Sequence, residues 1–216
     1  MIRIDKGDYL TFASIATALH LKVDGPPVGE CEVKPGVWRR HPDIGDHSRS
    51  DISRDGYMGV MFMALVKKDR TIFERIRKAG WKRRWTMGDR GHWDYTNMAP
   101  LVPVFYAEKW KWFPTLPTLC TPWNNTGFRA HLLALIILIE HLMGKRRRSH
   151  RQGAGGLHKK NPDNPWFEAL HCLVHGHAFG LPPDFEFSRE EGGYRWGSCP
   201  AEVFEALTRF TARETE

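Results

Sequence analysis

Cysteine and long apolar runs are both scarce in this chain. Its four cysteines are widely spaced among 216 residues and form no Cys-x-x-Cys pair, which predicts reduced thiols in a cytoplasmic product rather than a disulfide scaffold. The N-terminal residues lack the apolar segment of a secretory signal, and the apolar run at 132–138 is too short to cross a bilayer. We therefore expect no membrane insertion. If the protein reaches the cell envelope, we expect it to be released by a route other than a secretory signal. The cysteines are Cys31, Cys120, Cys172 and Cys199.

Strand-like alternation and repeats of fixed length are lacking as well. Apolar residues recur instead at helical spacing, which predicts a mainly α protein with a single helical domain over 1–216 and long loops. Residues 145–160 are basic and rich in glycine, so we expect a flexible basic loop there. The expected helices cover residues 9–21, 53–67, 71–81, 98–110, 128–143, 165–178 and 200–212.

Acidic residues are fewer than basic ones: the chain has 25 Asp and Glu and 32 Lys and Arg, which gives a net charge of +7. That sign suits nucleic acid, an anionic cell-wall polymer or an acidic polysaccharide as partner. No nucleic-acid-binding signature with fixed spacing accompanies it. Aromatic residues are abundant, with nine Trp and twelve Phe, which is typical of a packed core or of an aromatic-walled ligand groove.

The segment 41–57 concentrates four Asp, two His and two Arg and then enters an apolar helix. Asp51 and Asp55 are four residues apart and share one face if both lie in the first helical turn, with Arg54 beside them. A helix N-terminus lowers the pKa of a carboxylate, which favours a nucleophile or a general base. Simple capping of the helix explains the same residues equally well.

The segment 81–95 alternates aromatic and cationic residues, a pattern suited to a groove for sugars or polyanions. His92 and Asp94 flank Trp93 and form a second candidate acid–base pair. The alternative is a loop whose tryptophans fill the core. The candidate substrate-binding residues from these segments and from the cluster near residue 195 are Arg54, Tyr57, Trp81, Trp85, Trp93, Arg195 and Trp196.

Histidines in the second half of the chain invite a metal site. His171 and His175 lie at the i, i+4 spacing that zinc ligands use, but the residue after the first His is not the Glu of the zinc-protease motif. A structural role for these histidines is therefore favoured, and neither a metal nor a cofactor is predicted. On the helix 128–143, His131 and Glu140 fall on opposite sides, so they are expected to be satisfied in the core or at its edge rather than to form a dyad. The basic run 145–151 could bind phosphates or remain a solvated loop.

The sequence 51–59, Asp-Ile-Ser-Arg-Asp-Gly-Tyr-Met-Gly, resembles the opening of an inner helix in (α/α)-toroid proteins that act on glycans. Segments 85–88, 129–135 and 161–165 resemble bacterial and phage helical proteins of that kind, and the resemblance spans residues 38–200. Complete toroids are longer, so it implies a reduced or partial ring. It also implies a central cleft faced by Asp51, Arg54 and Asp55 and lined by Trp81, Trp85, His92 and Trp93.

These observations predict a carbohydrate-active enzyme, a glycoside hydrolase acting on a polysaccharide or peptidoglycan. Glycoside hydrolysis uses one ionised and one protonated carboxyl group. Asp55 is the expected ionised member, and the acid is Asp51, Asp94 or a Glu from residues 186–191. Three alternatives stay open: a polysaccharide lyase with a His or Tyr base, a nucleic-acid-binding protein using residues 82–84 and 145–151, and a metal-dependent hydrolase using His171 and His175.

Overall fold

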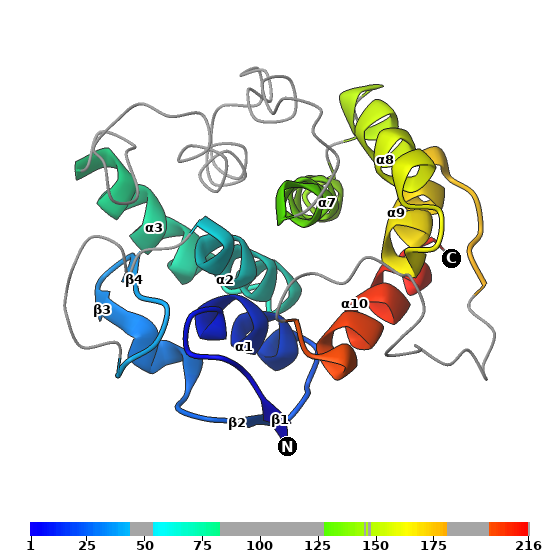
Figure 1. Cartoon of the computed structure of the whole chain (residues 1–216). Helices are drawn as coiled ribbons and strands as arrows, with labels where there is room; N and C mark the ends of the chain where they lie inside the picture. Colours follow the sequence, from blue (N-terminus) through cyan, green and yellow to red (C-terminus); the bar gives the residue numbers. More distant parts are fainter. Residues whose placement is uncertain (44–53, 83–127, 145, 147, 181–198, 216) are drawn as a thin grey trace.

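The computed structural model describes residues 1–43, 54–82, 128–144, 146, 148–180 and 199–215, and its described part is mainly helical, as predicted (Figure 1). Two short pairs of strands accompany the helices. β1 (Ile2–Arg3) pairs in parallel with β2 (Val23–Asp24), and β3 (Glu32–Lys34) pairs antiparallel with β4 (Val37–Trp38). The α-helices are α1 (Tyr9–Ala18), α2 (Arg54–Val66), α3 (Arg70–Lys82), α7 (Phe128–Leu142), α8 (Arg148–Lys160), α9 (Pro165–His175) and α10 (Ala201–Arg213).

Helices α1 and α2 pack so closely that glycine is required between them. A Cβ atom on Gly59 would lie 2.5 Å from the carbonyl oxygen of Thr11, and one on Gly56 would lie 2.7 Å from a methyl group of Leu10. The sequence predicted a helix over 53–67 that is buried on nearly every side. The structure confirms it, since residues 55–64 are all buried.

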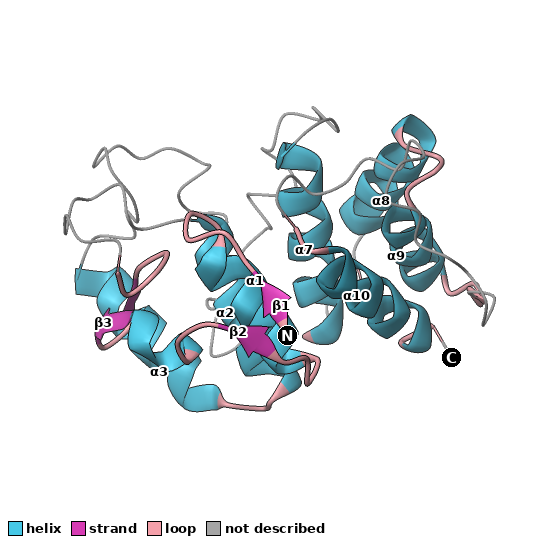
Figure 2. Cartoon of the chain, turned by 60° about the horizontal axis from the view of Figure 1, so that its bottom comes forward, coloured by secondary structure: helices cyan, strands magenta, loops and turns pink. Residues whose placement is uncertain are grey.

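Helix α7 is buried along most of its length, because every residue from Ala130 to Glu140 is buried. It contacts α2 on one side and α8 and α9 on the other, and both views place it between these groups (Figures 1 and 2). Helix α9 then contacts α10, which returns to α1. The expected partial toroid remains a prediction from resemblance. None of the described helices is long and apolar enough to cross a membrane.

The ends of α9 follow the local rules that its sequence suggested. The Asn164 side chain accepts hydrogen bonds from the backbone N–H groups of Trp166 and Phe167, at 3.1 and 3.2 Å, and Pro165 occupies the first helical position. Gly176 ends the helix with a φ of 75°, a left-handed conformation that suits glycine. The helix therefore stops slightly before the predicted boundary near residue 178.

The prediction of a flexible basic loop at 145–160 is wrong for residues 148–160, which form α8. Three glycines make this segment a poor helix former in isolation, but packing against a neighbour overrides propensity. Its buried face consists of His150, Gly153, Ala154 and Leu157. A Cβ atom on Gly153 would lie only 2.9 Å from Ile137 Cδ1, so glycine here permits a close approach of α8 to α7.

Candidate functional site

The structure describes only part of the predicted loop–helix site. Asp55 lies in the first turn of α2 and is 8% exposed, so this carboxylate belongs to a buried helix start as expected. Arg54 begins α2, and Trp81 lies in the last turn of α3. The remaining residues predicted for catalysis or binding lie outside the described part of the chain: Asp51, Trp85, His92, Trp93, Asp94, Arg195 and Trp196.

Tyr57, predicted to bind substrate, lies in the core instead. Its side chain is 1% exposed, and its hydroxyl donates a hydrogen bond to the Gly36 carbonyl at 2.9 Å. The same hydroxyl accepts from the backbone N–H of Trp38 at 3.2 Å. Both bonds fix the β3–β4 hairpin to α2, because Gly36 is in the turn between the two strands. Within the described residues, Tyr57 is thus a buried residue that holds this hairpin against α2.

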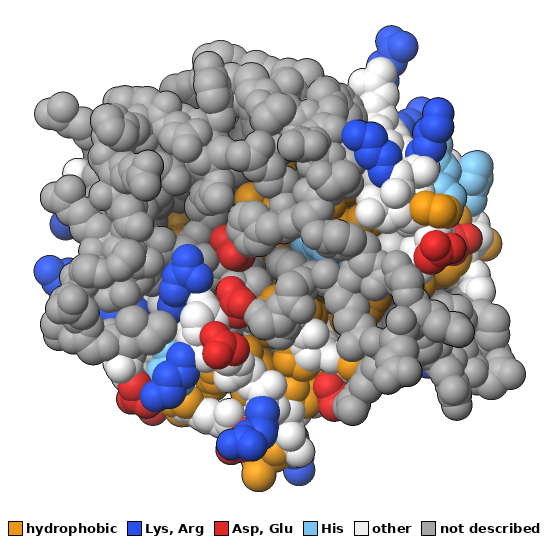
Figure 3. All heavy atoms as spheres, viewed as in Figure 1, with side chains coloured by type: hydrophobic (Ala, Val, Ile, Leu, Met, Phe, Trp, Pro, Cys, Tyr) orange, Lys and Arg blue, Asp and Glu red, His pale blue; other side chains and the backbone are white. Residues whose placement is uncertain are grey.

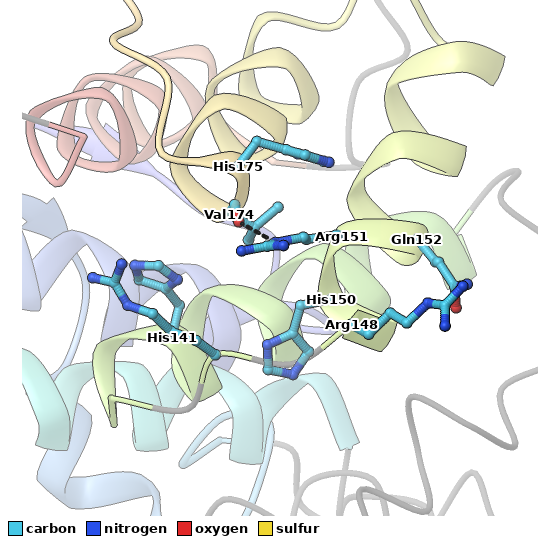
Figure 4. A pocket seen from close by; sticks show the side chains of 8 residues that line it. His141, Arg148, His150, Arg151, Gln152, Val174 and His175 are labelled. Atoms are coloured by element: carbon cyan, nitrogen blue, oxygen red, sulfur yellow. Dashed lines mark hydrogen bonds between the residues drawn. The ribbon is translucent and has the colours of Figure 1, made fainter.

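A pocket of about 580 Å³ lies where the end of α7, the start of α8 and the end of α9 meet (Figure 4). Its described lining is dominated by arginine and histidine and contains no acidic residue. In the view of Figure 3, Lys and Arg side chains and histidines gather at the upper right, over the region of α8. The lining residues are His141, Arg146, Arg148, His150, Arg151, Gln152, Val174 and His175.

His150 is anchored at this pocket by Glu140, a carboxylate that directly follows the apolar run 132–139 of α7. His150 Nε2 is paired with Glu140 Oε2, and the two side chains are 1% and 0% exposed. His150 Nδ1 and Glu140 Oε1 are also buried and have no hydrogen-bond partner within the described residues. A carboxylate on one ring nitrogen fixes the tautomer and orientation of an imidazole, which leaves the other nitrogen for chemistry.

The chain reversal at Gly144 creates this pair. Gly144 has a φ of 74° and ends α7, so that α8 turns back and brings His150 to Glu140, ten residues earlier. The sequence predicted Gly144 as the stop of this helix. The basic, glycine-rich residues after Gly144 predict a loop, so the sequence does not predict the pair. The available signal is Glu140 itself, since a carboxylate that directly follows the apolar run 132–139 of a buried helix needs a partner.

Electrostatics in the pocket favour an anion. The pKa of His141 is lowered, first by burial and then by Arg146 and His150, so this imidazole stays neutral at neutral pH. The guanidinium of Arg151 donates a hydrogen bond through Nε to the Val174 carbonyl at 3.3 Å, which ties α8 to α9 beside the pocket. Arg146, Arg148 and Arg151 therefore bring three positive charges to the lining.

Of the histidines considered as metal ligands, His175 lines the pocket and its ring packs against that of His171. The rings of His171 and His175 have centroids 4.1 Å apart, and His158 stacks on His171 at 5.2 Å. His175 Nδ1 is hydrogen-bonded to the His171 carbonyl at 2.9 Å. In the described part of the chain, no group of three or more His, Cys, Asp or Glu is placed to hold a metal ion. The metal-dependent alternative therefore rests on the i, i+4 spacing alone.

The described pocket can transfer a proton and hold an anion, which are the two tasks that an acid–base enzyme with an anionic substrate must perform. Asp55 is not among the lining residues, all of which fall between residues 141 and 175. Comparison with models of known protein families, with curated proteins and with solved structures finds no match.

Proposed function

We propose that this protein is a carbohydrate-active enzyme that transfers protons to or from an anionic glycan, with His150 as the acid–base group. The observation that carries the proposal is the buried pair of His150 and Glu140 beside a pocket lined by three arginines. The excess of basic residues and of tryptophan in the sequence supports the choice of an anionic glycan.

In this mechanism Glu140 is a positioning residue. Its carboxylate accepts the Nε2–H of His150 and stabilises the imidazolium that forms when Nδ1 takes a proton. Arg148 and Arg151 neutralise the negative group of the substrate and hold it against the imidazole. Gln152, which also lines the pocket, supplies a neutral donor and acceptor for sugar hydroxyl groups.

This geometry suits elimination as well as hydrolysis. In elimination from a uronate, His150 removes the proton beside the carboxylate, the bond to the leaving oxygen breaks, a C=C double bond forms and the leaving oxygen gains a proton. Arginine neutralises the carboxylate and so favours loss of that proton. Hydrolysis by paired carboxyl groups at Asp55 remains the alternative predicted from the sequence, and it requires a second acid.

The test incubates the full chain with anionic polysaccharides and peptidoglycan and follows both new reducing ends and the ultraviolet absorbance of an unsaturated sugar. We expect His150→Gln to lose at least about a hundredfold in rate, the usual contribution of a general acid or base. Glu205→Gln changes a surface carboxylate and serves as the folded control.

Circular dichroism and thermal unfolding must show that His150→Gln is folded. Full activity in folded His150→Gln, with activity lost in Asp55→Asn, would overturn the assignment and move the site to the start of α2. No product from any substrate would remove the enzymatic proposal.

A second candidate is a nucleic-acid-binding protein. Exposed cations lie at both ends of α8, Arg148 and Arg151 at its pocket end and Lys159 and Lys160 at its C-terminal end. Such binding would weaken steeply with salt, with a slope of about −0.9 per phosphate contacted on duplex DNA. It would also be indifferent to His150→Gln, which separates it from the enzymatic proposal.

A further inference from the structure

The pocket lies at the N-terminus of α8, which adds backbone donors to its side chains. Arg148, His150 and Arg151 all belong to the first four residues of this 13-residue helix, and its first turn contains no acidic residue. The first N–H groups of a helix have no acceptor within the helix, and the dipole makes this end positive. Phosphate and other anions bind at such ends.

A second observation at the same place points to a ligand. The side chain of His150 is 1% exposed and lines the pocket, and its Nδ1 atom has no hydrogen-bond partner in the described part of the chain. A buried polar atom without a partner costs about 1–3 kcal/mol. Nδ1 takes a proton in the neutral imidazole and donates to an acceptor oxygen of a bound anion in the imidazolium, the two states between which the proposed mechanism alternates.

The number of donors indicates which anion fits. A carboxylate has only two acceptor oxygens, with about four lone-pair positions between them, and one negative charge. The described lining includes three arginines and the imidazole of His150, and it lies at the first turn of α8. A terminal phosphate has three acceptor oxygens and a charge of about −1.5 to −2 at neutral pH. The pocket volume, about 580 Å³, is within the range of small-ligand sites, about 300–1,000 Å³.

We propose that this pocket recognises a terminal phosphate group, so that the substrate is a phosphorylated carbohydrate. This inference rests on the proposed function, because Arg148, His150 and Arg151 at the start of α8 form both the acid–base site and the phosphate site. The three arginines of the pocket all fall within residues 146–151, and this clustering around one pocket favours a single dianionic group over the repeated phosphodiesters of a nucleic acid.

The test measures binding to the full chain by isothermal titration calorimetry at constant ionic strength. The probes are inorganic phosphate, glucose 6-phosphate, glucuronate and a short single-stranded oligonucleotide. We expect phosphate and glucose 6-phosphate to bind more tightly than glucuronate, and Arg148→Gln to weaken both about tenfold. Lys160→Gln, an exposed cation at the other end of α8, should change binding less than about twofold and is the matched control.

Two results would overturn the inference. Equal losses in Arg148→Gln and Lys160→Gln would show that only overall charge matters. Binding of glucuronate or the oligonucleotide as tight as that of glucose 6-phosphate would reject a phosphate-specific pocket. This outcome can be told apart from that of the proposed function. Phosphate binding without turnover would reject the enzymatic proposal but support the phosphate site. Turnover of a glycan without phosphate binding would support the enzymatic proposal but reject the phosphate site.

Discussion

Replacing one member of the buried pair in α7 and α8 should destabilise the protein far more than replacing both. Glu140 and His150 are 0% and 1% exposed, so the partner that remains in Glu140→Leu or His150→Phe is left in an apolar interior. Removing one partner of a buried pair costs about 3–5 kcal/mol, whereas replacing both by apolar residues is often close to neutral. Because the free energy of unfolding of a typical protein is about 5–15 kcal/mol, either single change should remove a large fraction of it.

The assay is urea unfolding of the wild type, both single variants and the double variant, read as a double-mutant cycle. We expect a coupling free energy of at least about 2 kcal/mol between the two positions. Glu205→Gln is the surface control: Glu205 contacts Arg209 at 2.9 Å on α10 with 41% of its side chain exposed, and its loss should cost less than about 0.5 kcal/mol. Additive single effects, or a cost for Glu140→Leu no larger than that of the control, would refute the reasoning.

Three further outcomes follow from contacts elsewhere. Gly59→Ala should cost about 1–3 kcal/mol because its Cβ would lie 2.5 Å from the Thr11 carbonyl oxygen, whereas Gly29→Ala, with no atom within 4 Å, should be nearly neutral in thermal unfolding. Asn164→Ala should cost about 1 kcal/mol, measured by urea unfolding, and an unchanged midpoint would contradict its role as cap. Burial and then three nearby histidines lower the pKa of His171 below its ordinary 6.5, so its contribution to stability is present above that pH and is lost as pH falls. His171→Gln should therefore reduce the loss of stability between about pH 7 and pH 5. An unchanged pH profile of stability would contradict this.

Sequence reasoning succeeded where the signal was local. The apolar periodicity of α2 and α7, the Asn-Pro start of α9 and the stop at Gly144 all depend on residues within a few positions of one another. The start of α3 shows the limit of such rules. The sequence predicted a helix from residue 71, but α3 begins at Arg70, and the carboxylate of the preceding Asp69 accepts from both the N–H and the hydroxyl of Thr71 at 3.0 and 2.7 Å.

The candidate site could not be predicted because it depends on a long-range contact. Helix α8 exists where glycines and cations suggested a loop, since its stability comes from packing on α7. Without that helix, His150 belongs to a solvated run and Glu140 has no partner. At the predicted loop–helix site, the sequence correctly placed Asp55 in the first turn of α2. Tyr57, in contrast, holds the β3–β4 hairpin.

The contact of α10 with both α9 and α1 has a consequence for truncation and for folding during synthesis. The indole N–H of Trp166 in α9 donates to the Thr211 hydroxyl at 3.2 Å, and Val203 and Leu207 are fully buried. A fragment that ends before residue 201 would therefore expose apolar surface on two helices that are far apart in the chain. A ribosome-bound chain can close this core only after residues 201–213 have left the exit tunnel, and until then it is exposed to aggregation and to chaperones.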